Sequence, residues 1–195
     1  KLPCFASFVC RQMGAKKVLI FNRTVSRAKE LAQEFGFEAC GDLDVLKSLE
    51  ALHVVIDTLP GSSEFVLPDA AVSVLRRCRP VVLEAAYIPR RTAFLSQALA
   101  ANCEVVEGIE MLFEQGCAQC QIWTGKPAPR LEIAEALLQA LFTPGSSHPA
   151  HAKMEPYSDL PKSLVLEARG RSRSGALVVQ DLCCTPLRQL AKLAT

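Results

Sequence analysis

The sequence predicts an α/β protein with a Rossmann-like, doubly wound parallel sheet. Short, predominantly apolar runs alternate with amphipathic helical stretches along most of the chain. Strands that are apolar on both faces are typical of parallel sheets with helices covering both sides. The chain has 195 residues, of which 50% are hydrophobic, so it can bury one good core. We therefore predict one principal domain over residues 1–145, followed by a tail or linker over residues 146–195.

The alternation begins near the first residue. The chain opens on a helical pattern, and Gly14 is typical of the residue that ends a helix. Residues 18–21 form a continuous apolar run, which predicts a buried strand. An amphipathic helix is predicted from Ser26 onward, and Gly36 ends it.

The same alternation continues through the rest of the domain. The predicted strands are residues 54–59, 81–85 and 105–106, and the predicted helices are residues 70–77, 92–101, a long stretch that follows Gly108 as far as Trp123, and residues 131–142. The last of these helices is followed by residues 143–147, where the composition changes to proline, serine and arginine. We place the domain boundary at this change of composition.

Composition excludes several classes of function. The net charge is +2, and the basic residues are interspersed with carboxylates, so no nucleic-acid partner is expected. No apolar stretch approaches the roughly 18 residues of a transmembrane helix, so we expect a soluble, cytoplasmic protein with no membrane partner. Because the first residue is not methionine and the chain opens on a helical pattern, we expect a piece of a longer polypeptide.

The nine cysteines suggest reduced, buried thiols, because they lie in apolar runs. Cys117 and Cys120 have the spacing of a redox motif but fall inside the long predicted helix, where a thiolate is not favoured. His148 and His151 flank proline without a matching cysteine pair nearby, so we predict no metal site.

The segment Asn22-Arg23-Thr24 directly follows the first apolar strand. In a dinucleotide-binding fold, an acidic residue at this place favours NAD, whereas arginine accommodates the 2′-phosphate of NADP. Arg27 lies one turn into the next helix, whose N-terminus favours anions. Taken alone, the tripeptide fits a helix start with solvated arginines better than a phosphate site.

Residues 22–28 resemble the NADP-phosphate motif of shikimate dehydrogenases, at the same place after a strand. Residues 106–116 and 122–125 resemble the version of that family found in the fungal arom polypeptide. The resemblance implies NADP as the cofactor, with Gly108 and Met111 beside the nicotinamide. It also implies that Gln115 forms hydrogen bonds with the hydroxyls of shikimate.

Two further segments carry the same resemblance. Residues 83–92 are similar to the strand end at which a tyrosine of the family reaches the substrate, which makes Tyr87 a predicted substrate contact. Residues 58–60 resemble the stretch beside the nicotinamide ribose, and Thr58 is the predicted contact there. Asp57 departs from the family, which usually has a small or neutral residue at this position.

The resemblance also implies parts that this sequence lacks. The sequence contains no Gly-x-Gly-x-x-Gly loop, which in the family follows the first strand and binds the pyrophosphate. We expect that strand and loop, and the family's catalytic lysine and aspartate, to precede Lys1, so no catalytic residue is assigned in this chain. Residues 164–167 or 176–180 are the strand-like runs that could replace the missing central strand.

Two functions remain open at this stage. The first is an enzyme domain for the NADPH-dependent reduction of 3-dehydroshikimate to shikimate, inactive as this piece alone. The second is a regulatory domain of the quinate repressor type, which resembles the last domains of arom and senses a pathway metabolite without catalysis.

Overall fold

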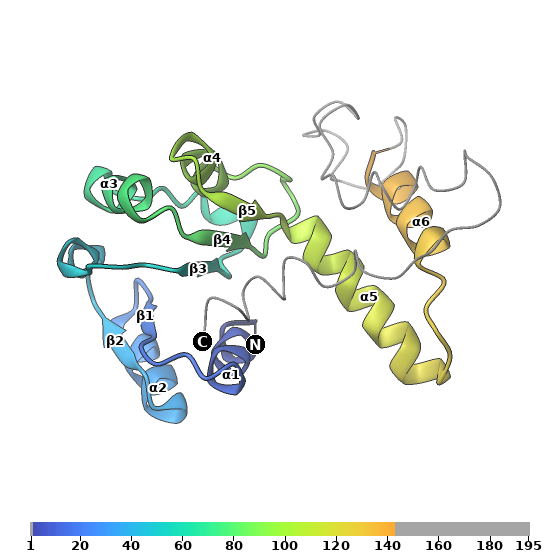
Figure 1. Ribbon diagram of the computed structural model, residues 1–195, viewed down its shortest axis with the longest axis horizontal. Helices are drawn as coiled ribbons and strands as arrows, with labels where there is room; N and C mark the ends of the chain where they lie inside the picture. Colours follow the sequence, from blue (N-terminus) through green and yellow to red (C-terminus); the bar gives the residue numbers. More distant parts are fainter. Residues whose placement is uncertain (1, 143–195) are drawn as a thin grey trace.

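The computed structural model describes residues 2–142, in which strands and helices alternate (Figure 1). The strands are β1 (Leu19–Phe21), β2 (Glu38–Cys40), β3 (Val54–Asp57), β4 (Val81–Glu84) and β5 (Glu104–Val106). The α-helices are α1 (Leu2–Gln12), α2 (Val25–Phe35), α3 (Asp69–Cys78), α4 (Ala93–Ala100), α5 (Gly108–Thr124) and α6 (Arg130–Phe142). Two short 3-10 helices, η1 (Leu43–Ser48) and η2 (Gly61–Ser63), complete the order.

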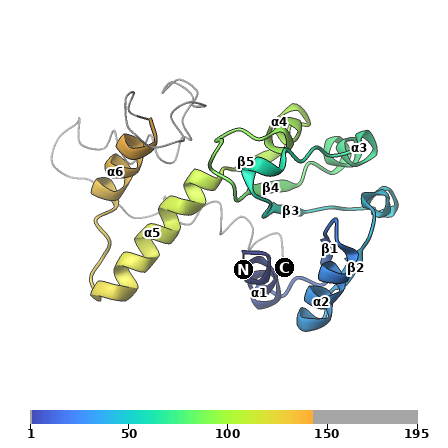
Figure 2. The same cartoon turned by 180° about the vertical axis from the view of Figure 1, so that it is seen from behind.

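The strands form two parallel sheets, with β1 beside β2 and the order β3-β4-β5 in the other. A doubly wound sheet has the order 3-2-1-4-5-6. The pair β2-β1 matches positions 3-2, and β3-β4-β5 matches positions 4-5-6. Within residues 2–142 no strand joins β1 to β3, and both views show the two sheets apart (Figures 1 and 2). The predicted fold class is confirmed, whereas the proposed replacement strands and the tail lie outside the described residues.

Strand β4 forms the centre of the core, and all four of its residues are buried. Val82 packs on one face, among residues of α3 and α4 such as Leu75 and Phe94. Val81 and Leu83 point to the opposite face, where Met111 of α5 packs against them. Each fully buried aliphatic side chain of this kind contributes about 1.5–3 kcal/mol. Burial on both faces is what the apolar run at residues 81–85 predicts.

An aromatic chain connects the two sheets across the place of the absent strand. The ring of Phe21, at the end of β1, lies 6.4 Å from the ring of Phe65, in the loop between η2 and α3. The ring of Phe65 in turn lies 6.2 Å from that of Phe94, which is buried in α4. These tilted contacts hold the β1–β2 pair against the larger sheet.

Most predicted helix ends are confirmed, but one strand was missed. Gly14 and Gly36 both have a left-handed φ, at 72° and 73°, as expected after α1 and α2. Strand β2 is only three residues long, Glu-Ala-Cys, and offers no apolar run that sequence inspection would detect. Its register with β1 comes from the tertiary structure, since Cys40 is buried opposite Phe21.

Candidate functional site

The first part of the candidate site is the turn from β1 into α2. The side chain of Asn22 accepts a hydrogen bond from the backbone N–H of Thr24 at 2.9 Å, which shapes the turn. Thr24 is the N-cap of α2, and its hydroxyl makes no capping hydrogen bond. Arg23 and Arg27 are exposed, and the first turn of α2 contains no acidic residue. The turn therefore presents two cations at a helix N-terminus, an arrangement that favours an anion.

The second part is the carboxyl end of β3. The carboxylate of Asp57 accepts a hydrogen bond from the backbone N–H of Leu59 at 2.9 Å and so folds the chain back after the strand. Burial raises the pKa of Asp57, although hydrogen bonds from Leu59 and Thr58 partly offset this effect. Thr58, the predicted ribose contact, is half-buried at this edge.

Glu84, at the end of β4, is in register with Asp57 and only 1% exposed. One of its oxygens accepts a hydrogen bond from the backbone N–H of Ala86 at 3.0 Å, and the other accepts from the hydroxyl of Thr92 at 2.6 Å. Burial raises the pKa of Glu84, and the neighbouring charge of Asp57 raises it further. The side chain thus ties together both ends of the loop that separates β4 from α4.

We call residues 85–91 the Tyr87 loop. Its backbone is tightly enclosed on two sides by glycines. A Cβ atom on Gly61 would lie 2.2 Å from the carbonyl oxygen of Ile88, and one on Gly108 would lie 2.3 Å from that of Ala86. These approaches exclude any side chain at either glycine. The Tyr87 side chain, by contrast, is 36% exposed, so the loop presents it outward.

The third part is the start of α5. Glu107 is the N-cap in a capping box: its side chain accepts from the backbone of Glu110, and its own N–H donates to Glu110 Oε2 at 2.9 Å. Met111 is half-buried, and Gln115, one turn further along, is exposed. Residues spaced by four share a helix face, so Met111 and Gln115 continue one stripe from the helix N-terminus.

A buried ion pair joins the Tyr87 loop to this helix start. Arg90 Nε donates to Glu107 Oε2 at 2.7 Å and Arg90 Nη2 donates to Glu107 Oε1 at 3.0 Å. Sequence inspection missed this pair because its partners are 17 positions apart, in a loop and a cap. No local pattern marks Glu107 either, because glutamate stands where a capping box usually has serine or threonine.

The structure places the predicted residues in two groups, both at carboxyl ends of parallel strands. The first group, on the β1–α2 turn, comprises Asn22, Arg23, Thr24 and Arg27. The second group, on the edge of the larger sheet and on α5, comprises Thr58, Tyr87, Gly108, Met111 and Gln115. Ligands of open α/β sheets bind at carboxyl ends of strands. The sheet gap between β1 and β3 separates the two groups.

Other kinds of site receive no support from residues 2–142. No group of three histidine, cysteine, aspartate or glutamate residues in that range could hold a metal ion. No helix in the same range is long and apolar enough to cross a membrane. Cys117 is buried in α5 and Cys120 is half-buried there, whereas the predicted absence of a metal at His148 and His151 concerns residues outside the described range.

Comparison with known proteins identifies the family. The sequence model of the shikimate / quinate 5-dehydrogenase family matches residues 5–104, and that of the shikimate 5′-dehydrogenase C-terminal domain matches residues 108–138. The chain belongs to the shikimate / quinate 5-dehydrogenase family. The two matches cover both groups of the candidate site and agree with the resemblance of residues 22–28 and 106–116.

Relatives in this family include both long and short proteins. The pentafunctional AROM polypeptide of Komagataella phaffii is 33% identical over an alignment of 130 residues, which covers 62% of this chain and 8% of that protein. The NADP(+) shikimate dehydrogenase of Ignicoccus hospitalis is 32% identical over an alignment of 129 residues, which covers 64% of this chain and 47% of that enzyme. The chain therefore spans about half the length of this shikimate dehydrogenase.

A solved structure shows the same fold. The shikimate 5-dehydrogenase of Thermus thermophilus, in complex with NADP(H) and shikimate, aligns with a TM-score of 0.58 at 27% identity. The alignment covers 69% of this chain and 50% of that one. The shikimate dehydrogenase fold thus extends over most of residues 2–142.

Proposed function

We propose that this chain is the NADP-binding half of a shikimate dehydrogenase, which reduces 3-dehydroshikimate to shikimate on the route to chorismate and the aromatic amino acids. The observation that carries the proposal is the β1–α2 turn, where Arg23 and Arg27 are exposed at a helix N-terminus without an acidic residue in its first turn. The similarity to NADP(+) shikimate dehydrogenases and to AROM polypeptides supports the same assignment.

The residues present fit one end of NADP well. Arg23 and Arg27 can pair with the 2′-phosphate, while Thr24 offers its hydroxyl and Asn22 holds the turn in shape. We assign Thr58, Gly108 and Met111 to the nicotinamide end. When bound, NADPH supplies the hydride for the reduction. The protein's task is to hold the two ends of the cofactor apart at the correct separation.

The substrate contacts that we propose are Tyr87 and Gln115. Both side chains are exposed, and both lie at the carboxyl edge where Met111 is found. A phenol and an amide can each donate and accept, which suits a ligand with several hydroxyl groups. No acid/base pair is assigned to this chain, so we propose that it does not turn over alone and works with other domains of a longer polypeptide.

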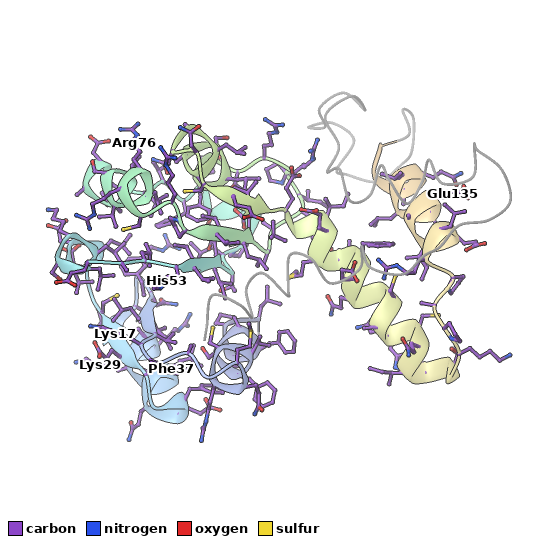
Figure 3. The ribbon with its side chains drawn as sticks, in the orientation of Figure 1. Lys17, Lys29, Phe37, His53, Arg76 and Glu135 are labelled. Carbon is purple, nitrogen blue, oxygen red and sulfur yellow. The ribbon has the colours of Figure 1, made fainter. Side chains whose placement is uncertain are left out.

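The phosphate assignment is tested by titrating the chain with NADPH and NADH while following nicotinamide fluorescence. We expect tighter binding of NADPH, and we expect Arg23→Ala with Arg27→Ala to weaken it by about tenfold to hundredfold while NADH binding changes little. Lys29→Ala is the matched control, because it removes a cation from the exposed face of α2 without touching the turn (Figure 3). Equal affinity for the two cofactors would refute the assignment.

A second candidate is a regulatory domain of the quinate repressor type. Such a domain would sense a pathway metabolite without catalysis. A sensor should bind shikimate or quinate with an affinity that NADPH does not alter, whereas an enzyme domain should show coupling between the two ligands. Calorimetric titration of shikimate with and without NADPH distinguishes these cases.

A further inference from the structure

The Arg90–Glu107 pair is more deeply buried than the other ion pairs that we compare with it. Its side chains are 3% and 11% exposed, whereas those of Arg130 and Glu114 are 16% and 29% exposed and those of Lys17 and Glu38 are 58% and 65% exposed. The contact is a two-pronged fork, with both carboxylate oxygens engaged. Desolvating two charges is costly, and such a pair is often no more stable than apolar residues of the same size. Stability alone is therefore a weak reason for its presence.

The position of the pair suggests another role. The fork connects the Tyr87 loop to the first turn of α5, which are separate elements. On the loop side, Arg90 lies three residues after Tyr87; on the helix side, Glu107 precedes Gly108. Glu107 also accepts from the backbone of Glu110, so its carboxylate has one fixed orientation. Because the Glu107 carboxylate is held in place and the Arg90 guanidinium is planar, the two hydrogen bonds fix both the distance and the angle between the loop and the helix.

Other contacts of the loop run to β4 or bring its backbone close to glycines. Glu84 holds the two ends of the loop to β4, through Ala86 and Thr92. Gly61 and Gly108 allow the backbone to approach closely, but a glycine contact has no directional preference. Of these contacts, only Arg90–Glu107 is a directional side-chain bond from the loop to α5.

We propose that Arg90 and Glu107 are positioning residues that hold Tyr87 in register with the Gly108–Met111 turn, and thereby couple substrate binding to cofactor binding. This inference rests on the proposed function, which assigns Tyr87 to shikimate and Gly108 and Met111 to the nicotinamide. Neither Arg90 nor Glu107 is assigned a ligand contact. Loss of the fork lets the loop and the helix move relative to each other, so each ligand has to reorder the site that the other uses.

The deciding variant is the double substitution Arg90→Met with Glu107→Gln. Arg90→Met alone leaves a buried carboxylate without its cation and should lower the melting temperature strongly. In the double variant the amide oxygen of glutamine still caps α5, and neither charge of the pair remains. We expect most of the thermal stability to return while the fork stays broken. Lys17→Met with Glu38→Gln is the matched control, because it removes the same two charges at the β1–β2 sheet, away from α5 (Figure 3).

Two measurements on the full chain test the proposal. Hydrogen exchange should show faster exchange across the Tyr87 loop in the double variant, with β4 unchanged. The Kd for NADPH and the Kd for shikimate should each rise about three- to tenfold, and the coupling between the ligands should be lost. The control variant should match the wild-type protein in each respect.

The contrary outcomes are distinct. If the double variant exchanges and binds like the wild-type chain, the pair is only structural and the inference is wrong, while the proposed function stands. If the wild-type chain binds neither NADPH nor shikimate, the proposed function fails for this chain, and the coupling claim fails with it. Faster loop exchange with unchanged ligand affinities would also overturn the coupling claim.

Discussion

At the residue scale, Gly108 lets the start of α5 lie directly against the backbone of the Tyr87 loop. A Cβ at this position would meet the carbonyl oxygen of Ala86 at 2.3 Å and that of Ala85 at 2.8 Å. The neighbouring atoms are backbone, which cannot rotate away as a side chain can. At Gly116, on the same helix, an added Cβ would meet only the side chain of Ile133, at 3.9 Å. We therefore expect an added methyl group to destabilise the protein at Gly108 but not at Gly116.

We predict that Gly108→Ala lowers the free energy of unfolding by about 1–3 kcal/mol, because the loop must shift to admit a methyl group. Gly116→Ala should instead raise it by up to about 1 kcal/mol, because alanine is the better helix former and meets no clash. Urea denaturation of both variants checks the pair of predictions. An increase in stability for Gly108→Ala would contradict the close approach between α5 and the loop.

The raised pKa of Asp57 makes the free energy of unfolding depend on pH. Burial raises the pKa of Asp57, so the folded protein holds this proton more tightly than the unfolded chain does. The contribution of this group to the free energy of unfolding therefore falls as pH rises from the ordinary carboxyl pKa, about 4, through the raised pKa. Asp57→Asn keeps an oxygen to accept from Leu59 and removes the charge beside Glu84.

We predict that Asp57→Asn is more stable than the wild-type chain at pH 7, and that the difference shrinks as pH falls toward 4. Thermal unfolding monitored by circular dichroism across this range measures it. Asp44→Asn is the control, because Asp44 is an exposed residue of η1. A variant that loses stability at pH 7 would show that the charged form of Asp57 is needed.

At the residue scale, some features of the site could be predicted from the sequence and others could not. The carboxyl ends of β3 and β4 were predictable, because an apolar run that stops at a turn marks the edge of a parallel strand. Thr58 and Tyr87 were chosen there by resemblance to the family, and their ligand contacts stay a prediction. The burial of Glu84 and its bonds to Ala86 and Thr92 were not, because a carboxylate that closes a loop leaves no periodic signal. The departure at Asp57 was visible, but its raised pKa comes from tertiary burial.

At the scale of elements, α6 is attached to α5 by a cluster around Arg130. Arg130 donates to both oxygens of Glu114, at 3.2 and 2.8 Å, and its guanidinium lies 4.6 Å from the centroid of the Phe113 ring. Ala134 of α6 is buried in the same region, in a cluster with Phe113. Both views show α5 running outward from β5 and α6 beyond it, at the end of the molecule away from β1 (Figures 1 and 2).

We predict that Arg130→Met loosens α6 selectively, because the pair and the ring contact are lost while the apolar cluster remains. Breaking a partly buried pair of this kind should cost about 1–3 kcal/mol. Amide exchange should accelerate in α6 and stay unchanged in β4. Uniform acceleration throughout residues 2–142 would instead mean that α6 unfolds together with the sheet.

Helices and strands with a long, regular sequence pattern were predicted well, and those without one were missed. The long helix after Gly108 and the apolar strand at residues 81–85 agree closely with α5 and β4, because periodicity and burial act on many residues at once. Strand β2 was missed because its three residues are defined by pairing with β1. The capping box of α5 was missed because glutamate replaces the usual serine or threonine at the cap.

At the scale of the whole molecule, Phe65 takes part in the contact between the two sheets. Its ring is the middle of the Phe21–Phe65–Phe94 chain, and Phe94 belongs to the buried core. No strand between residues 2 and 142 bridges β1 and β3, and this contact is one of the links between the two groups of predicted site residues. The separation of those groups is a property of the packing, which no local sequence pattern reveals.

We predict that Phe65→Ala lowers the free energy of unfolding by up to about 3 kcal/mol, since the ring is partly buried. Exchange in β1 and β2 should then accelerate more than exchange in β4. Phe37→Ala is a suitable control, because that ring stacks with Phe35 beside β2 and does not reach the larger sheet (Figure 3). If both variants affect the two sheets equally, the aromatic link is not what joins them.

The central claim is that the β1–α2 turn recognises the 2′-phosphate of NADP. Amide chemical-shift mapping of the ¹⁵N-labelled chain with adenosine 2′,5′-bisphosphate, and with adenosine 5′-monophosphate for comparison, tests it most directly, since neither compound needs a pyrophosphate loop. We predict shifts at residues 22–27 that are large with the bisphosphate and weak with the monophosphate. Equal shifts with both compounds, or shifts confined to other parts of the chain, would contradict this claim.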